Sequence, residues 1–434
     1  MTDLMIGILG IVALFGLMIL RTPVAFAMLF TGFFGVWILD GLRRATAIMF
    51  TETYSSISNY NLIVVPMFVL LGNIASESGF SRALYDAAHA WVGRFRGGLA
   101  SASVIGCAAF SAVSGSSVAT AVTIGRVALP EMKRLGYGPG LSTGSIAAGG
   151  TLGFLIPPST GFVIYAILTE ESIGRLFMAG ILPGVLMSGL FILAIWVVTL
   201  RNPAAGPVGE AKPLSERIRL FGRAAPLVGV ITVSIGGIYL GVFTPVEASG
   251  IGAGLVIAIA LLSGSLSRAG FVNALGDTVK TSAMLYMIVV GANVLNPFLA
   301  ITDIPLALSH MLTSFGLGPY GTLVLILLSY VVLGMFLDGL AMLVVTIPIY
   351  YPIIMGLGFD PIWFGVIAVI VIEMGMITPP VGLNVFVVRS VAEDIPLHTI
   401  FKGVIPFLLA MLASLILIIL FPQIALAIPN SMFG

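Results

Sequence analysis

Long apolar runs recur from one end of the chain to the other, separated by short polar or glycine- and proline-containing segments. A helix of roughly 20 apolar residues crosses the hydrocarbon core of a bilayer. The runs are continuous, whereas the strands of a membrane barrel alternate apolar and polar residues. The pattern therefore predicts an all-α polytopic membrane protein.

Two regions contain half-length apolar runs that meet at a polar tip. In 97–134 the tip is Ser114–Ser117, and in 318–356 it is Leu337–Gly339. Two helices too short to span, joined by such a tip, are typical of a re-entrant hairpin. The exposed backbone of a hairpin is tolerated at membrane depth only where it lines a cavity inside the protein.

Two further regions, 140–168 and 361–389, are apolar but interrupted in the middle. Proline removes an amide donor and clashes with the preceding turn, so each region is predicted to be a broken helix. The interrupting residues are Gly153 with Pro157–Pro158 in the first region and Gly375 with Pro379–Pro380 in the second.

These features recur at one constant offset, which takes Gly153 to Gly375 and also Pro130 to Pro352. Prolines and glycines in register over a long stretch favour a duplication over a chance alignment of apolar helices. We expect a first repeat over 1–200, a cytoplasmic linker over 201–223 and a second repeat over 224–428.

Each repeat is predicted to contain the same four segments in the same order. The first has scaffold spans (1–79), an amphipathic arm (80–96), a re-entrant hairpin (97–134) and a broken helix (140–168). The second has scaffold spans (224–302), an arm (303–316), a hairpin (318–356) and a broken helix (361–389). Amphipathic segments such as the arms lie along a membrane surface more often than across it.

The composition excludes other classes of protein. The chain is 59% hydrophobic and only 9% charged, whereas soluble domains are about 25% charged. Nineteen Lys and Arg against eighteen Asp and Glu leave no basic surface for nucleic acid. Cys107 is the single cysteine, so an internal disulfide is impossible.

The positive charges predict the orientation. With the N-terminus outside, sixteen of the nineteen Lys and Arg fall on the cytoplasmic side, and the exceptions are Arg43, Arg44 and Arg175. This asymmetry follows the positive-inside rule. Both termini are then periplasmic, and an odd number of spans per repeat places the second repeat upside down relative to the first.

Inverted repeats with broken helices and paired hairpins are typical of secondary transporters. An unwound helix frees carbonyl groups that bind cations and amide groups at helix N-termini that hold anions. We therefore expect an ion-transporter-like fold. An intramembrane enzyme is excluded because the sequence has no Ser/His, paired-Asp or His-Glu-x-x-His constellation at membrane depth, and occluding hairpins argue against an open channel.

Several motifs together resemble the large membrane subunit of TRAP (tripartite ATP-independent periplasmic) transporters, of the DctM or SiaM type. The similarity covers nearly the whole chain. The motifs are Val65–Phe68, Ser114–Ala119, Pro130–Tyr137, Gly150–Ser159, Phe243–Ala248 and Thr378–Asn384.

The resemblance implies sodium-coupled import of a small carboxylate, such as a C4-dicarboxylate or sialic acid, across the bacterial inner membrane by an elevator mechanism. It implies two partners, a soluble periplasmic substrate-binding protein and a small four-helix membrane subunit. It implies no organic cofactor, and Na⁺ is the coupling ion. The alternative is a stand-alone sodium/dicarboxylate symporter or sodium/proton antiporter of the same architecture.

Given sodium coupling, the dense Ser/Gly tip facing the first helix break suggests a first Na⁺ site, because hydroxyl and carbonyl oxygens are hard ligands. The candidate ligands are Ser111 and Ser114 through hydroxyls and Gly153, Ile156 and Pro158 through backbone oxygens. Alternatively, the small residues only let the helices pack closely.

A second Na⁺ site is expected by symmetry, although Leu333 and Phe336 occupy the positions of Ser111 and Ser114 and carry no side-chain oxygen. The candidate ligands are Gly334, Gly375, Thr378 and Pro380.

The candidate substrate-binding residues are Ser116, Thr160, Asp338 and Asn384. Asp338 is an ionisable residue inside the membrane and is therefore a functional candidate, or it caps the half-helix that follows. Asn384 contacts the solute or satisfies a neighbouring carbonyl. Glu373 lies in an apolar segment and is assigned no role.

Overall fold

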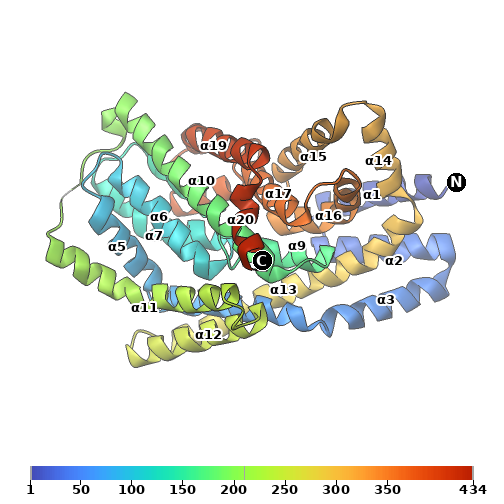
Figure 1. The fold of residues 1–434 in the computed structure, drawn as a ribbon, viewed down its shortest axis with the longest axis horizontal. Helices are drawn as coiled ribbons and strands as arrows, with labels where there is room; N and C mark the ends of the chain where they lie inside the picture. Colours follow the sequence, from blue (N-terminus) through green and yellow to red (C-terminus); the bar gives the residue numbers. More distant parts are fainter. Residues whose placement is uncertain (1, 210, 433–434) are drawn as a thin grey trace.

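The computed structural model describes residues 2–209 and 211–432, in which all regular elements are helices (Figure 1). Seven of the helices are long and apolar enough to cross a membrane. The predicted all-helical, multi-span architecture is therefore confirmed. Met1, at the start of the expected first repeat, and Glu210, in the expected linker, lie outside the described residues.

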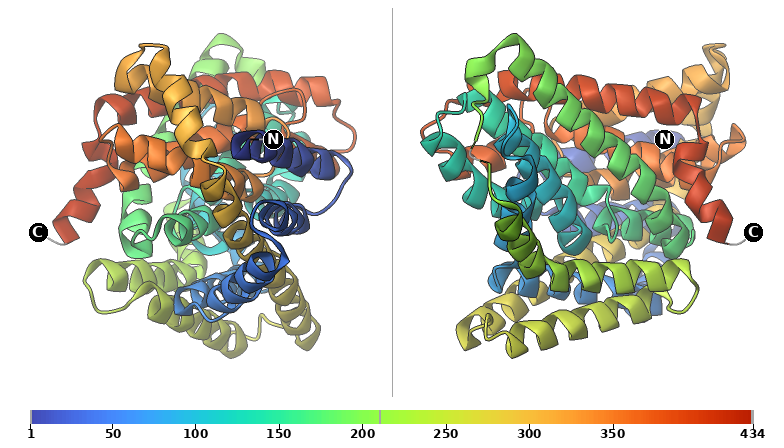
Figure 2. Two further views of the ribbon diagram at one scale, coloured as in Figure 1. Left: turned by 90° about the vertical axis from the view of Figure 1, so that its right-hand side faces the viewer. Right: turned by 60° about the vertical axis from the view of Figure 1, so that its left-hand side comes forward.

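One part of the molecule, here called the scaffold, is built around a long central helix, α13. The scaffold helices are α1 (Asp3–Ile19), α2 (Val24–Asp40), α3 (Leu42–Ile57), α4 (Val64–Glu77), α11 (Leu214–Tyr239), α12 (Pro245–Leu262) and α13 (Arg268–Ile301). α13 packs on α2, α3 and α4, and α12 packs on α4 and α11. Figure 2 shows α11 and α12 along one side of the molecule, opposite α15 and α19.

The other part, here called the core, contains the hairpins and broken helices. Its first half consists of α6 (Gly98–Ser114), α7 (Ser117–Arg134), α8 (Pro139–Thr151), η2 (Leu152–Phe154), α9 (Thr160–Thr169) and α10 (Ile173–Arg201). Its second half consists of α15 (Gly318–Gly334), α16 (Gly339–Gly356), α17 (Pro361–Met376), α18 (Leu383–Val391), α19 (Leu397–Leu420) and α20 (Gln423–Met432). The two halves interlock, because α8 packs on α19 and α9 packs on α16.

The helices of the core recur at the offset seen in the sequence. α16 starts and ends at the positions that correspond to the two ends of α7, and α17 starts at the position that corresponds to the start of α8. Each broken helix contains a cis Pro-Pro peptide bond, at Pro157–Pro158 and at Pro379–Pro380. The two halves of the core therefore share one backbone plan.

The scaffold halves differ more. α13 is continuous over 34 residues, whereas the corresponding stretch of the first half is divided into α3, the short helix η1 (Tyr60–Ile63) and α4. The polar stretch before Tyr60 is thus helical and packs on α2 and α13.

Short helices join the scaffold to the core at the expected arms. α5 (Phe80–Val92) leads from α4 to α6 and packs on α6 and α11, and α14 (Ile304–Ser314) leads from α13 to α15 and contacts α16. The linker after α10, which contains the short helix η3 (Pro203–Ala205), is held against the first hairpin and arm. Its backbone bonds join Gly97 N to Gly206 O (3.0 Å), Gly138 N to Ala205 O (2.9 Å) and Gly209 N to Gly93 O (3.1 Å).

Candidate functional site

The tip of the first hairpin packs directly on the first helix break. The carbonyl of Gly115 accepts hydrogen bonds from the backbone amide of Thr160 (3.2 Å) and from its hydroxyl (2.7 Å). A Cβ atom on Gly115 would lie 2.6 Å from the carbonyl oxygen of Pro158, and one on Gly153 would lie 2.5 Å from that of Ser116. Only glycine allows this approach, so tip and break form one unit.

The break leaves several carbonyl groups without hydrogen-bond donors. Pro157 and Pro158 have no N–H group, so the helical hydrogen bonds that would end there are missing. Among the described residues, no backbone or side-chain donor reaches five carbonyl oxygens of the break, those of Gly153, Leu155, Ile156, Pro157 and Pro158. They include the three backbone oxygens predicted for the first Na⁺ site.

The two hydroxyls predicted for this site are within the same hairpin. Ser111 is fully buried and donates to the carbonyl of Cys107 (2.6 Å). The Ser114 hydroxyl lies 2.7 Å from that of Thr120. Both oxygens retain lone pairs for a ligand, because a hydroxyl donates one hydrogen bond and accepts two. The arrangement provides hard, neutral oxygens suited to a small cation.

The second tip and break are also in backbone contact. A Cβ atom on Gly334 would lie 2.9 Å from the Cα of Gly375, and the amide of Gly382 donates to the carbonyl of Met335 (3.3 Å). The Thr378 hydroxyl donates to the carbonyl of Met374 (2.6 Å). Gly334, Gly375 and Thr378 are thus gathered at this break, with Pro380 next to them in the chain.

Asp338 caps the helix that follows it. Its Oδ1 atom accepts from the amides of Leu340 (3.1 Å) and Ala341 (3.0 Å). Ser116 caps α7 at the equivalent position, accepting from the amide of Ala119 (3.4 Å). Asp338 also lines a cavity of about 540 Å³ between the second tip and the scaffold helix α1.

The substrate candidates do not form one cluster. Ser116 and Thr160 line a cavity of about 180 Å³ between the first tip and the scaffold, together with Ser114. Asp338 lines the different cavity at the second tip. Asn384 is fully buried, and its Nδ2 atom lies 3.4 Å from Oε2 of Glu373.

Sequence reasoning missed the scaffold wall of the 180 Å³ cavity. Asn73 and Ser76 of α4 and Thr281 of α13 line it opposite the first tip. Asn73 donates to the hydroxyl of Thr278 (3.0 Å) and so connects α4 to α13. The available signal was a polar side chain within an apolar run, but such residues are common in membrane helices and do not by themselves identify a cavity.

Sequence reasoning also assigned no role to Glu373. This residue of α17 is fully buried, and the Ser117 hydroxyl at the start of α7 donates to its Oε1 atom (2.6 Å). The carboxyl group thus joins the two halves of the core.

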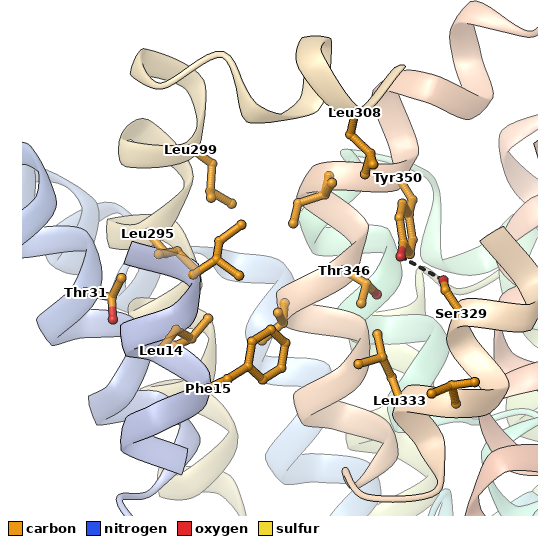
Figure 3. A pocket seen from close by; sticks show the side chains of 14 residues that line it. Leu14, Phe15, Thr31, Leu295, Leu299, Leu308, Ser329, Leu333, Thr346 and Tyr350 are labelled. Carbon is orange, nitrogen blue, oxygen red and sulfur yellow. Dashed lines mark hydrogen bonds between the residues drawn. The ribbon is translucent and has the colours of Figure 1, made fainter. Parts of the chain in front are cut away.

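An apolar cavity of about 520 Å³ separates the second hairpin from the scaffold. In Figure 3, Leu14, Phe15, Leu295 and Leu299 of the scaffold face Leu333 of α15 across an open space. The hydroxyls of Ser329 and Tyr350 bond to each other (2.7 Å), which satisfies two polar groups of the hairpin at this cavity.

Comparison with known proteins identifies the family of this chain. Residues 11–424 match the model of the tripartite ATP-independent periplasmic transporter, DctM component. The chain is 37% identical over 391 residues to the C4-dicarboxylate TRAP transporter large permease protein DctM of Pseudomonas aeruginosa, covering 89% of this chain and 90% of the relative. It is 31% identical to the sialic acid TRAP transporter large permease protein SiaM of Vibrio cholerae, covering 96% and 97%.

A solved structure shares the architecture. The YdaH transporter of Alcanivorax borkumensis superposes with a TM-score of 0.61 over 89% of this chain and 90% of that one, at 18% identity. Since the relatives are named as permeases, the chain is a transport protein and not an enzyme. With the family model matched over nearly its whole length, the chain belongs to the DctM family, the large membrane subunits of TRAP transporters.

Proposed function

We propose that this subunit imports a small carboxylate solute together with Na⁺, and that the solute is delivered by a periplasmic substrate-binding protein. A small membrane subunit completes the transporter in the bacterial inner membrane, and both termini of this chain are periplasmic. The relatives from P. aeruginosa and V. cholerae, named for C4-dicarboxylates and sialic acid, support a carboxylate.

One observation carries the proposal. The unpaired carbonyls of the first break lie beside the tip hydroxyls, at the wall of the 180 Å³ cavity between core and scaffold. An ion held by Ser111, Ser114, Gly153, Ile156 and Pro158 would stabilise the packing of tip on break. Because Ser114 serves both the ion site and the cavity, ion and solute binding would be coupled there.

The same cavity suits an anionic solute. α7 begins at Ser117 and α9 begins at Thr160, and Ser116 and Thr160 both line the cavity. Helix N-termini carry partial positive charge and unpaired amides, which favour a carboxylate group. Two such termini meet at this wall, and the hydroxyls of Ser116 and Thr160 add hydrogen-bonding atoms.

The contacts between core and scaffold support an elevator movement. Cavities lie between the scaffold and both hairpin tips, and the 520 Å³ cavity beside the second hairpin has apolar walls (Figure 3). Gly72 of α4 is the exception, because it packs on the backbone of Val113 and Ser114 at the first tip. Within the core, in contrast, the tips and breaks are in backbone contact. A core that is tightly packed within itself and bordered by cavities along part of its contact with the scaffold is suited to move as a rigid body.

The test is uptake of candidate carboxylates into proteoliposomes containing both membrane subunits. Na⁺ and the substrate-binding protein are each included or left out. We expect uptake only when both are present, and the acid that is taken up identifies the solute. Uptake that needs Na⁺ but no binding protein would favour a stand-alone symporter, and uptake without Na⁺ would refute the coupling.

A further inference from the structure

Glu373 is a buried acidic residue without a basic partner. Its exposed fraction is 0%, and among the described residues no lysine, arginine or histidine forms an ion pair with it. Its contacts are the Ser117 hydroxyl (2.6 Å) and the Asn384 amide (3.4 Å). A carboxylate in such surroundings is costly unless a cation compensates it.

The two candidate cation sites, in contrast, lack a negatively charged ligand. Their predicted ligands are hydroxyl and backbone oxygens, and none is an acid. In the part of the chain that the structure describes, no group of three or more His, Cys, Asp or Glu residues could hold a metal ion. A cation bound there would gain little from direct ligand charge, so its affinity would depend on a charge outside the first coordination sphere.

Glu373 is connected to both candidate sites through short structural links. Its partner Ser117 follows Ser116, and the Ser116 carbonyl and Ser117 amide form the surface against which Gly153 packs. In α17, Glu373 precedes Gly375 by two residues, and Gly375 contacts Gly334 at the second tip. Among the described residues, no other Asp or Glu is buried.

We infer that Glu373 is the counter-charge of the Na⁺ sites. It is a positioning and affinity-determining residue that contacts neither ion and lowers the electrostatic cost of holding both. This inference rests on the proposed sodium coupling. In the low-dielectric core, a unit charge acts over several ångströms with little screening. A counter-charge role also explains why this position holds glutamate. Glutamine would make the same hydrogen bonds without the cost of burying a charge.

The decisive comparison is between Glu373→Gln and Glu373→Asp. Glutamine keeps the size of the side chain, accepts from Ser117 and can donate to Asn384, whose Oδ1 atom is buried without a partner. Aspartate keeps the charge but shortens the side chain. A counter-charge role predicts that the aspartate variant binds Na⁺ more tightly than the glutamine variant, whereas a purely structural role predicts the reverse order.

The measurement is the Na⁺-dependent rise in melting temperature of the purified two-subunit transporter, with choline replacing Na⁺ at constant ionic strength. We expect the Na⁺ concentration at half effect to rise at least about tenfold in Glu373→Gln and within about threefold in Glu373→Asp. The Na⁺ concentration that gives half-maximal uptake should likewise be higher in Glu373→Gln than in Glu373→Asp. Equal Na⁺ affinity in wild type and Glu373→Gln, or a better-binding glutamine variant, would overturn the inference.

A matched control is Asp360→Asn, at the other end of α17. Asp360 caps this helix by accepting from the amide of Trp363 (2.9 Å), and asparagine caps equally well. We expect its Na⁺ affinity to equal that of wild type, and an equal loss in both variants would contradict a specific role for Glu373. A wild-type protein that neither binds nor needs Na⁺ would instead refute the proposed coupling itself.

Discussion

The two hairpin tips occupy equivalent positions in the core but differ in chemistry. At the first tip, Ser111, Ser114 and Ser116 present hydroxyls. At the second, the equivalent positions of the repeat hold Leu333, Phe336 and Asp338. The backbone geometry is shared, since each tip packs on its break through glycine. Duplicated backbone therefore preserves the place for a site, while the side chains decide what can bind there.

The largest effect is expected where the backbone contact itself is broken. In Gly153→Ala the new methyl group would lie 2.5 Å from the carbonyl oxygen of Ser116. Backbone cannot move aside as a flexible side chain can, so the tip and break must separate, at a cost of about 1–3 kcal/mol. We expect loss of Na⁺-driven uptake and a lower melting temperature.

The control for this change is Gly189→Ala in α10, where a Cβ atom meets nothing within 4 Å. Alanine in a helix is favoured over glycine, so this variant should retain full uptake. If Gly153→Ala also transported at the wild-type rate, the close packing of tip on break would have no functional meaning.

The next test separates the two tips by their hydroxyls. In Ser114→Leu a predicted ligand is removed and apolar bulk is added at the cavity wall. We expect Na⁺-driven uptake to be abolished, as measured in proteoliposomes. Leu333→Ala at the second tip removes no oxygen and should preserve Na⁺ dependence. Unchanged Na⁺ dependence in Ser114→Leu would eliminate the first site as predicted.

The number of coupled ions also distinguishes the two tips. If both tips bind Na⁺, uptake titrated with Na⁺ should show a Hill coefficient above one. A coefficient of one in the wild type would count against the second site, which has Thr378 as its sole predicted side-chain ligand. The first site would be unaffected by that result.

A smaller effect is expected at Asp338, where capping and solute binding can be distinguished. Asp338→Asn keeps an oxygen that accepts from Leu340 and Ala341, whereas Asp338→Ala removes the cap and costs about 1 kcal/mol. If capping is its whole role, asparagine retains uptake and melting temperature, and alanine lowers the melting temperature. A loss of uptake in both variants at unchanged melting temperature would instead indicate contact with the solute.

The smallest effect is expected for the ion pair between Lys133 of α7 and Asp394, which follows α18. The two charges lie 2.6 Å apart but are exposed, and such surface pairs contribute little. The hydrogen bond from Lys133 holds the pKa of Asp394 below its ordinary value. The pair therefore persists at neutral pH and is lost only as the pH falls through that lowered pKa.

Accordingly, Lys133→Ala should leave the melting temperature and uptake at pH 7 unchanged. Melting curves of wild type and variant, recorded from neutral to acidic pH, would test this. A clear loss at pH 7 would show that the pair holds the two halves of the core together.

Local sequence features alone predicted the membrane class, the two hairpins and the two broken helices. Each of these follows from local physics: continuous apolar runs need a bilayer, and proline pairs such as Pro157–Pro158 remove helical hydrogen bonds. The repeat was visible because glycine and proline are hard to replace where the backbone is unusual. The helical character of the polar stretch before Tyr60 was not visible, because its weak pattern gains stability from packing on α2 and α13.

Contacts between distant segments could be read only from the folded arrangement. It joined Ser117 to Glu373, which are far apart in the chain, and it separated Asp338 and Asn384 from the cavity that Ser116 and Thr160 line. Spacing along a helix predicts neighbours within one turn but not contacts between segments that are distant in sequence. For the same reason the sequence did not identify Asn73 and Thr281 as cavity-lining residues. The cavity that they line forms only when scaffold and core pack together.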